Sequence, residues 1–151
     1  MDLTPIVDRL SGQLSQVPYV RYAKGAAQAL EDAFKQQKGS VWAFVVPGPV
    51  SFSPVRDWGE QIGDQERARQ LASVRFSVLL VAKNVSDRRG KAAADELHPV
   101  LTALRARLAG WVPPECHTPI ECVSGLPRGD TADGYLFVWE ETFSTAYDEI
   151  N

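Results

Sequence analysis

The residues best suited to chemistry are two cysteines and a histidine that lie close together in the chain. Cys116, His117 and Cys122 could in principle supply three zinc ligands. Structural zinc sites have four ligands and contain close pairs such as C-x₂-C, and the chain has no second cluster of ligand residues. We therefore expect two free thiols and a surface histidine, with no bound metal. A disulfide between the two cysteines is not expected in a reducing compartment.

Covalent catalysis requires a nucleophile, a base and an orienting group within reach of one another. Cys116 and His117 are adjacent in sequence, which does not place the thiol on the imidazole. No G-x-S-x-G, P-loop or G-x-G-x-x-G motif occurs. Glu140 and Glu141 fall on an expected strand and so face opposite sides, and we interpret them as a solvated edge. The sequence thus predicts no enzyme, no catalytic residue and no cofactor.

Three arginines lie at even spacing and would share one face of a strand. They are Arg67, Arg69 and Arg75. Either this is a solvated face, or it is a row of guanidiniums that meets carboxylates of a neighbouring subunit.

Two short motifs, the adhesion tripeptide at residues 128–130 and the glycosylation acceptor at residues 84–86, are interpreted as turns because three-residue motifs recur by chance.

Length and composition predict one ordinary globular domain that covers residues 1–151. The chain has 151 residues, 44% of them hydrophobic and 23% charged, with a net charge of −3. A mildly acidic chain lacks the basic footprint of a general nucleic-acid binder and the polybasic segment that attracts a protein to membranes. Met1 to Pro5 shows no Sec-type signal. We therefore expect a soluble protein of a bacterial-type cytosol that binds neither specific nucleic acid nor membrane.

Three helices are expected from apolar residues at helical spacing. The first begins with Thr4 as the N-cap and runs through Val17. The second covers residues 23–34 and is closed by Gly39 and Ser40, and the third covers residues 88–109. Pro99 should kink the third helix or break it near His98, and Gly110 is its predicted C-cap.

Strands are expected where apolar residues run continuously or alternate. Val41 to Val46 predicts a buried strand, residues 47–66 a loose hairpin tip, and residues 67–83 a long strand. A short strand near Ile120 to Val123 precedes a final strand over residues 135–147, which carries an aromatic ladder on one side. We predict an α+β fold with a mostly antiparallel mixed sheet of four to five strands and helices packed on one face.

Taken in order, several stretches resemble the tail terminator (tail completion) proteins of long-tailed bacteriophages and prophages. The resemblance covers roughly residues 5–148. It rests on a first helix followed by VRYAKGAA at 20–27, VWAFVVP at 41–47, RFSVLLVAKN at 75–84, a helix ending in LAGWVP at 108–113, and WEETFSTAY at 139–147. Each fragment is short, so the specificity lies in their order.

This resemblance implies a small α+β protomer that assembles into a ring, usually a hexamer. The ring caps the growing tail tube, stops its polymerisation and offers a surface for head joining. The implied partners are other copies of the chain, the major tail tube protein and head–tail connector proteins. The implied location is the host cytoplasm during assembly and then the virion tail, and the subunit can stay monomeric until it meets the tube. Pro99 within the third helix departs from the family pattern.

A ring with head-to-tail contacts needs two different patches on each protomer. One candidate patch is the hairpin around Trp58 with the arginine row. The other is the end of the last strand, at Tyr147, with the 126–134 turn, which holds Arg128 and Asp130. Trp58 lies in a polar stretch and is either tucked under its own loop or an interface anchor.

Two other functions stay open at this point. A head–tail adaptor or neck protein of a phage would have a similar composition and would bind the portal. A small-ligand binding module would instead have a closed apolar pocket, for which the ladder of Phe137, Trp139 and Phe143 is the candidate wall.

Overall fold

A computed structural model of the chain describes residues 1–14, 17, 19–35, 41–53, 57–62, 65–83, 91–130 and 136–150, with the backbone alone at 57–62, 65–69, 91–94, 129–130 and 149–150. The elements, in chain order, are α1 (Thr4–Leu10), β1 (Val20–Tyr22), α2 (Ala26–Lys35), β2 (Val41–Phe52), β3 (Asp57–Ile62), β4 (Gln65–Lys83), α3 (Lys91–Leu108), β5 (Glu121–Asp130) and β6 (Leu136–Ile150).

The strands form one mixed sheet, as predicted. Its order is β1-β2-β4-β6-β5, and β3 pairs with β4 outside this path. β1 runs parallel to β2, whereas the β2–β4, β3–β4, β4–β6 and β5–β6 pairs are antiparallel. This arrangement confirms the α+β class and the mostly antiparallel sheet, with β3 as an addition to the five strands of the main path.

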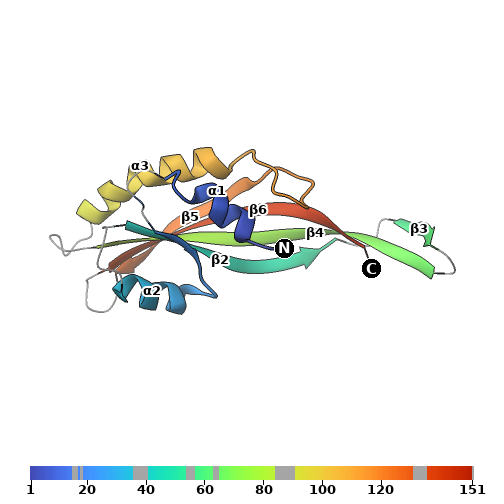
Figure 1. Cartoon of the computed structure of the whole chain (residues 1–151), viewed down its shortest axis with the longest axis horizontal. Helices are drawn as coiled ribbons and strands as arrows, with labels where there is room; N and C mark the ends of the chain where they lie inside the picture. Colours follow the sequence, from blue (N-terminus) through green and yellow to red (C-terminus); the bar gives the residue numbers. More distant parts are fainter. Residues whose placement is uncertain are drawn as a thin grey trace.

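The helices cover both faces of the sheet, whereas the sequence predicted that they pack on one face. α1 and α3 lie on one side and α2 on the other (Figure 1). The first core contains Ile6, Leu104 and the even-numbered residues of β4 from Phe76 to Ala82. The second core packs Ala29 and Ala33 of α2 against another set of buried residues. That set comprises Trp42, Phe44, Leu79 and Val81. We name these sides the α1–α3 face and the α2 face.

The first helix is shorter than predicted and is capped differently. Thr4 lies inside the helix rather than at its N-cap, and its backbone N–H donates to the Asp2 carboxylate at 2.9 Å. Gly12 has a φ of +72°, a left-handed conformation that ends a helix and suits glycine. The chain therefore leaves the helix after Leu10, although Leu14 remains buried beyond it.

The third helix runs without a break from Lys91 to Leu108, so the predicted break near His98 is wrong. Pro99 is exposed on this helix. The His98 carbonyl, which lies one residue before the proline, accepts a hydrogen bond from the Thr102 hydroxyl at 3.2 Å. Gly110 has a φ of +84°, and this confirms the predicted glycine at the end of the helix.

The strands are longer than the apolar runs predicted. β2 continues to Phe52, and β3 and β4 occupy most of what the sequence indicated as a loose hairpin tip. Residues 128–130 belong to β5 and do not form a turn. The expected helix closure at Gly39 and Ser40, the turn at residues 84–86 and residues 131–134 of the 126–134 turn lie outside the described residues.

One end of the sheet projects beyond the helices (Figure 1). We call this end the arm and define it as Val50–Phe52 of β2, all of β3, residues 65–75 of β4 and residues 144–150 of β6. Its backbone is held together by the β2–β4, β3–β4 and β4–β6 ladders. The arm therefore presents two sheet faces that none of the described helices covers.

Candidate functional site

The first predicted patch lies on the arm. Trp58 is in β3, and Arg67 and Arg69 are near the start of β4, with their side chains outside the described part. The ladder places Arg67 opposite Glu60 and Arg69 opposite Asp57. Directly opposite positions are close enough for charge pairing. Two arginines of the row thus have acidic residues of their own chain at the facing register positions.

Arg75 differs from the other two arginines because it faces a serine. It lies opposite Ser144 of β6. It is exposed and has no hydrogen-bond or ion-pair partner among the described residues. It lines an open cleft of about 460 Å³ together with Pro49 and three serines, Ser51, Ser73 and Ser144. The cleft therefore combines a free guanidinium with hydroxyl groups.

A bulge in β2 shapes this cleft. The register with β4 shifts between Pro47 and Val50. Gly48 lies so close to β4 that a Cβ there would be 2.5 Å from the carbonyl oxygen of Arg75. Only glycine permits this approach, because real Cβ atoms do not come so near to backbone oxygen. The bulge thus holds Pro49 and Ser51 beside Arg75.

The other face of the arm is apolar. Val50 and Phe52 lie opposite Val74 and Ala72, which share the α1–α3 face with Phe76. Val50 is 43% exposed and Phe52 is 54% exposed, values that are high for large apolar side chains. Contiguous exposed apolar surface marks contact sites on soluble proteins. The arm is therefore two-sided, with apolar side chains on one face and hydroxyls and a cation on the other.

The second predicted patch is not brought together as one surface. Tyr147 lies opposite Ala72 on the apolar side of the arm and lines a cleft of about 340 Å³ with Met1, Glu115 and Cys116. Arg128 lies on β5 and pairs with Glu140 of β6 at 2.9 Å. Asp130 ends β5 opposite Phe137, and its side chain is outside the described residues.

Sequence reasoning missed a buried ionic cluster under α3. Glu141 is 2% exposed, which corrects its interpretation as part of a solvated edge. Its carboxylate accepts two hydrogen bonds from Arg105, at 2.8 and 3.0 Å, and one from Trp139 Nε1 at 2.8 Å. The hydrogen bond to Glu141 is the main cause that raises the pKa of Arg105. The cluster ties α3 to β6.

Gly125 of β5 closes this cluster from the edge of the sheet. It lies opposite Glu141 in the ladder. A Cβ at this position would collide with the Glu141 carboxylate and would lie 3.1 Å from Trp139 Cζ2. Glycine is therefore needed here because the carboxylate and the indole fill the space that a side chain would use.

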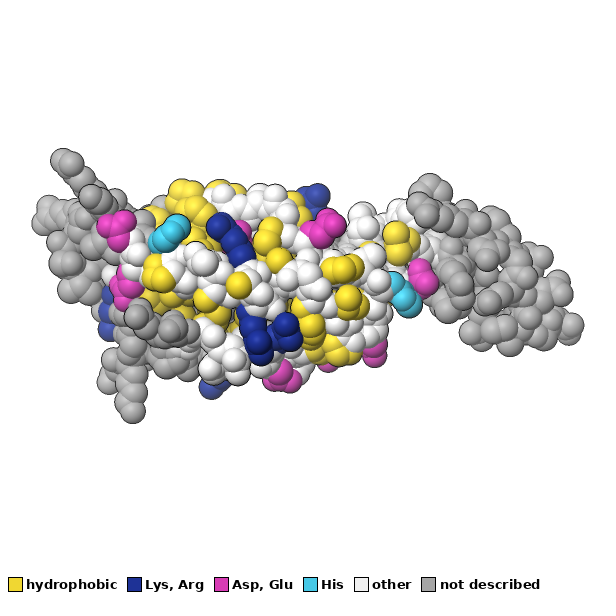
Figure 2. All heavy atoms as spheres, turned by 90° about the horizontal axis from the view of Figure 1, so that it is seen from above, with side chains coloured by type: hydrophobic (Ala, Val, Ile, Leu, Met, Phe, Trp, Pro, Cys, Tyr) yellow, Lys and Arg dark blue, Asp and Glu magenta, His cyan; other side chains and the backbone are white. Residues whose placement is uncertain are grey.

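Basic side chains gather near the middle of the α1–α3 face (Figure 2). The ends of α1 and α3 are joined there by a reciprocal contact: Arg9 Nε donates to the Arg107 carbonyl at 2.8 Å, and Arg107 Nε donates to the Arg9 carbonyl at 3.3 Å. The Arg9 guanidinium also lies 4.5 Å from the centre of the Trp111 ring. Cations at helix C-termini are stabilising, so both arginines have a structural role.

The cysteines and the histidine do not form a metal centre. Both cysteines are free thiols. Partial burial is the largest cause that raises the pKa of Cys116 and of Cys122. His117 Nε2 lies 3.6 Å from an Asp148 carboxylate oxygen. Among the described residues, no group of three or more His, Cys, Asp and Glu side chains could hold a metal ion.

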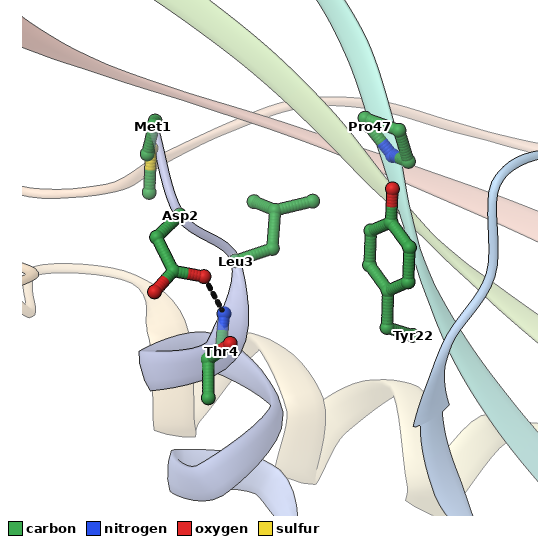
Figure 3. A pocket seen from close by; sticks show the side chains of 6 residues that line it. All are labelled: Met1, Asp2, Leu3, Thr4, Tyr22 and Pro47. Atoms are coloured by element: carbon green, nitrogen blue, oxygen red, sulfur yellow. Dashed lines mark hydrogen bonds between the residues drawn. The ribbon is translucent and has the colours of Figure 1, made fainter.

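A small cleft lies at the N-terminus. Met1, Asp2, Leu3 and Thr4 line it from one side and Tyr22 and Pro47 from the other, with a volume of about 260 Å³ (Figure 3). Leu3 is directed into the space between the two sides, and the Asp2 carboxylate is occupied by the Thr4 N–H (Figure 3). Asp2, the one charged side chain among these lining residues, thus already has a hydrogen-bond partner.

The aromatic ladder of β6 belongs to the core. Phe143 is fully buried and stacks on Phe76 with ring centres 5.5 Å apart. Phe137 and Trp139 pack against the same core. The ladder thus fills the space in which a ligand pocket was considered.

In the part of the chain that the structure describes, no helix is long and apolar enough to cross a membrane.

The α+β fold carries an arm whose two sheet faces are not covered by the described helices. The family model for the phage tail terminator protein matches residues 1–151, the whole chain, and the chain belongs to this family. It is therefore a structural protein of the phage tail and contacts other tail or head proteins. Comparison with curated proteins found no match.

Proposed function

We propose that this protein caps the end of the phage tail tube, terminates tube polymerisation and provides the surface to which the head joins. Membership of the tail terminator family over residues 1–151 supports this role, which one domain would carry. The subunits form a ring, a hexamer, by head-to-tail contacts, and each subunit can stay monomeric until it meets the tube. Assembly takes place in the host cytoplasm, with the major tail tube protein and the head–tail connector proteins as partners.

The arm is the observation that carries this proposal. Its α1–α3 face exposes Val50 and Phe52, and burying such side chains in a contact stabilises the assembly by removing apolar surface from water. The β2 edge next to the arm does not favour strand addition: Pro47 and Pro49 lack an N–H, and the register of β2 shifts between Pro47 and Val50. Contacts through the side chains of a face therefore suit the arm better than pairing through its edge.

Deletion of the gene tests the function directly. Lysates of the deleted phage should contain headless tails whose tubes exceed the normal length, because nothing stops polymerisation. The length distribution is measured by electron microscopy, and a plasmid copy of the gene should restore it. Headless tails of normal length would instead indicate a neck protein that acts after termination. Normal virions would exclude both roles.

A surface variant tests the arm. Phe52→Ser removes an exposed side chain and should leave the thermal unfolding temperature almost unchanged, whereas complementation of the deletion should fail. Val112→Ser is the matched control, because Val112 is 44% exposed and lies in the loop after α3, which is not part of the arm as defined. Full complementation by Phe52→Ser would show that this apolar face of the arm is not needed for the proposed function.

A further inference from the structure

Among the described side chains, an unpaired cation and an unpaired carboxylate lie on the α2 face of the sheet near the base of the arm. Arg75 of β4 lies opposite Ser144 of β6, and Ser144 in turn lies opposite Glu121 of β5. The three residues therefore form one row across the sheet and share a face. Arg75 and Glu121 are both exposed.

The two charges do not neutralise each other within one chain. β6 lies between their strands, so their backbones are two strand spacings apart, about 9–10 Å. No ion pair joins them, and neither has another polar partner among the described residues. This contrasts with Arg128 of β5 and Glu140 of β6, which lie on adjacent strands and pair at 2.9 Å.

The hydroxyls around Arg75 are also unpaired. Ser51, Ser73 and Ser144 line its cleft, and their hydroxyls make no hydrogen bond to other described residues. The hydroxyls of the next pair toward α2, Ser77 and Thr142, are hydrogen-bonded to each other at 3.2 Å. The surface around Arg75 therefore offers donors that no other described residue uses. Ser73 and Ser144 also line a smaller cleft that includes Glu121.

We infer that a second copy of this chain docks on this part of the α2 face and that its Glu121 pairs with Arg75. Charge complementarity selects the occupant: each copy carries an unpaired guanidinium and an unpaired carboxylate, so the Glu121 of one copy can pair with the Arg75 of the next in a head-to-tail ring. Serine hydroxyls border the pair and can hydrogen-bond across the contact. The inference deepens the proposed function, because it names a contact between subunits of the proposed ring.

Charge reversal tests the pair. Arg75→Glu or Glu121→Arg alone should weaken self-association roughly tenfold or more, because like charges would meet in the contact. The double variant should regain it, and so should a mixture of the two single variants, in which each copy supplies the charge that the other lacks. Association is measured by light scattering in solution and by the amount of protein retained on purified tails. Arg21→Glu, an exposed arginine on β1 at the opposite edge of the sheet from β5, is the matched control.

A cross-link tests the contact without disrupting it. Arg75→Lys keeps the positive charge and supplies an amine that carbodiimide couples to a carboxylate in direct contact. ¹⁵N-labelled and unlabelled protein are mixed, assembled on tails lacking the native copy and cross-linked. Mass spectrometry should find mixed-isotope peptides that join position 75 to Glu121. Only same-isotope cross-links, or none at this pair, would overturn the inference.

The outcomes separate this inference from the proposed function. If the single reversals complement the deletion fully and self-associate normally, the pair is wrong while tube capping stands. If deletion leaves tail length normal, tube capping is wrong, and the cross-link still decides the pair. DNA binding that Arg75→Glu abolishes and that the double variant does not restore would assign the cleft to phosphates and overturn a protein contact.

Discussion

Arg105 and Glu141 meet through two parallel hydrogen bonds, from Nε to one carboxylate oxygen and from Nη2 to the other. The two partners are unequally placed: the Arg105 side chain is 45% exposed, whereas that of Glu141 is 3% exposed. A buried carboxylate without its cation costs far more than a half-exposed cation without its carboxylate. The stability of the α3–β6 contact should therefore respond differently to the loss of each partner.

Removing the arginine should be the more damaging change. We expect Arg105→Ala to lower the free energy of unfolding by about 3 kcal/mol, because it leaves Glu141 buried and uncompensated. Glu141→Gln should cost only about 1–2 kcal/mol, because the amide keeps the volume and solvent can hydrate Arg105. The double variant should be more stable than Arg105→Ala alone. Urea denaturation measures all three, and equal losses for the two single variants would contradict the asymmetry.

A methyl group at Gly125 should disturb the same cluster from β5. Gly125→Ala places a Cβ against the Glu141 carboxylate and the Trp139 ring. We expect a loss of about 1–3 kcal/mol from the forced displacement. Gly25→Ala is the matched control: no atom lies within 4 Å of a Cβ there, so its effect should stay within about 0.5 kcal/mol. Thermal unfolding of both variants decides the matter, and equal stabilities would mean that β5 adjusts freely.

The sequence predicted most of the elements, and its main error concerns the second face of the sheet. The signal was present in β2, where Val41 to Val45 are all buried, because a strand buried on both faces is apolar throughout. Leu79 and Val81 in β4 carried the same signal. Arg75 and Ser77, the preceding odd-numbered residues of β4, are polar, and for this reason the sequence indicated a solvent-facing side for the whole strand. The odd-numbered side of β4 thus faces solvent within the arm and packs against α2 over the rest of the strand.

The ionic cluster could be predicted only in part. Glu141 alternates with Phe137, Trp139 and Phe143, so it falls on the core-facing side of the strand and requires a buried partner. The partner could not be chosen from sequence, because Arg105 and Arg107 both suit the end of a helix. The structure distinguishes them: Arg105 reaches Glu141, whereas Arg107 binds the carbonyl of Arg9.

The carboxyl group of Asp2 should titrate below the ordinary range of aspartate. Its hydrogen bond from the Thr4 N–H is the largest cause that lowers the pKa, and the N-terminal amine is the smallest. A depressed pKa in the folded state means that this contact stabilises the fold at neutral pH and is lost as the pH falls through the folded pKa. NMR titration measures the shift. Most of it should survive N-terminal acetylation, and its disappearance would assign it to the amine.

Trp58 should matter for assembly and not for folding. It lies on β3, which pairs only with β4 among the described strands. We expect Trp58→Ala to unfold at the temperature of the wild-type protein and to lose ring formation or tube capping, because aromatic anchors dominate contact energies. Trp42→Ala is the contrasting variant: Trp42 is fully buried, so its loss should cost about 3–5 kcal/mol. Calorimetry and complementation of the gene deletion report the two effects separately. Normal capping by Trp58→Ala would show that this tryptophan is no anchor.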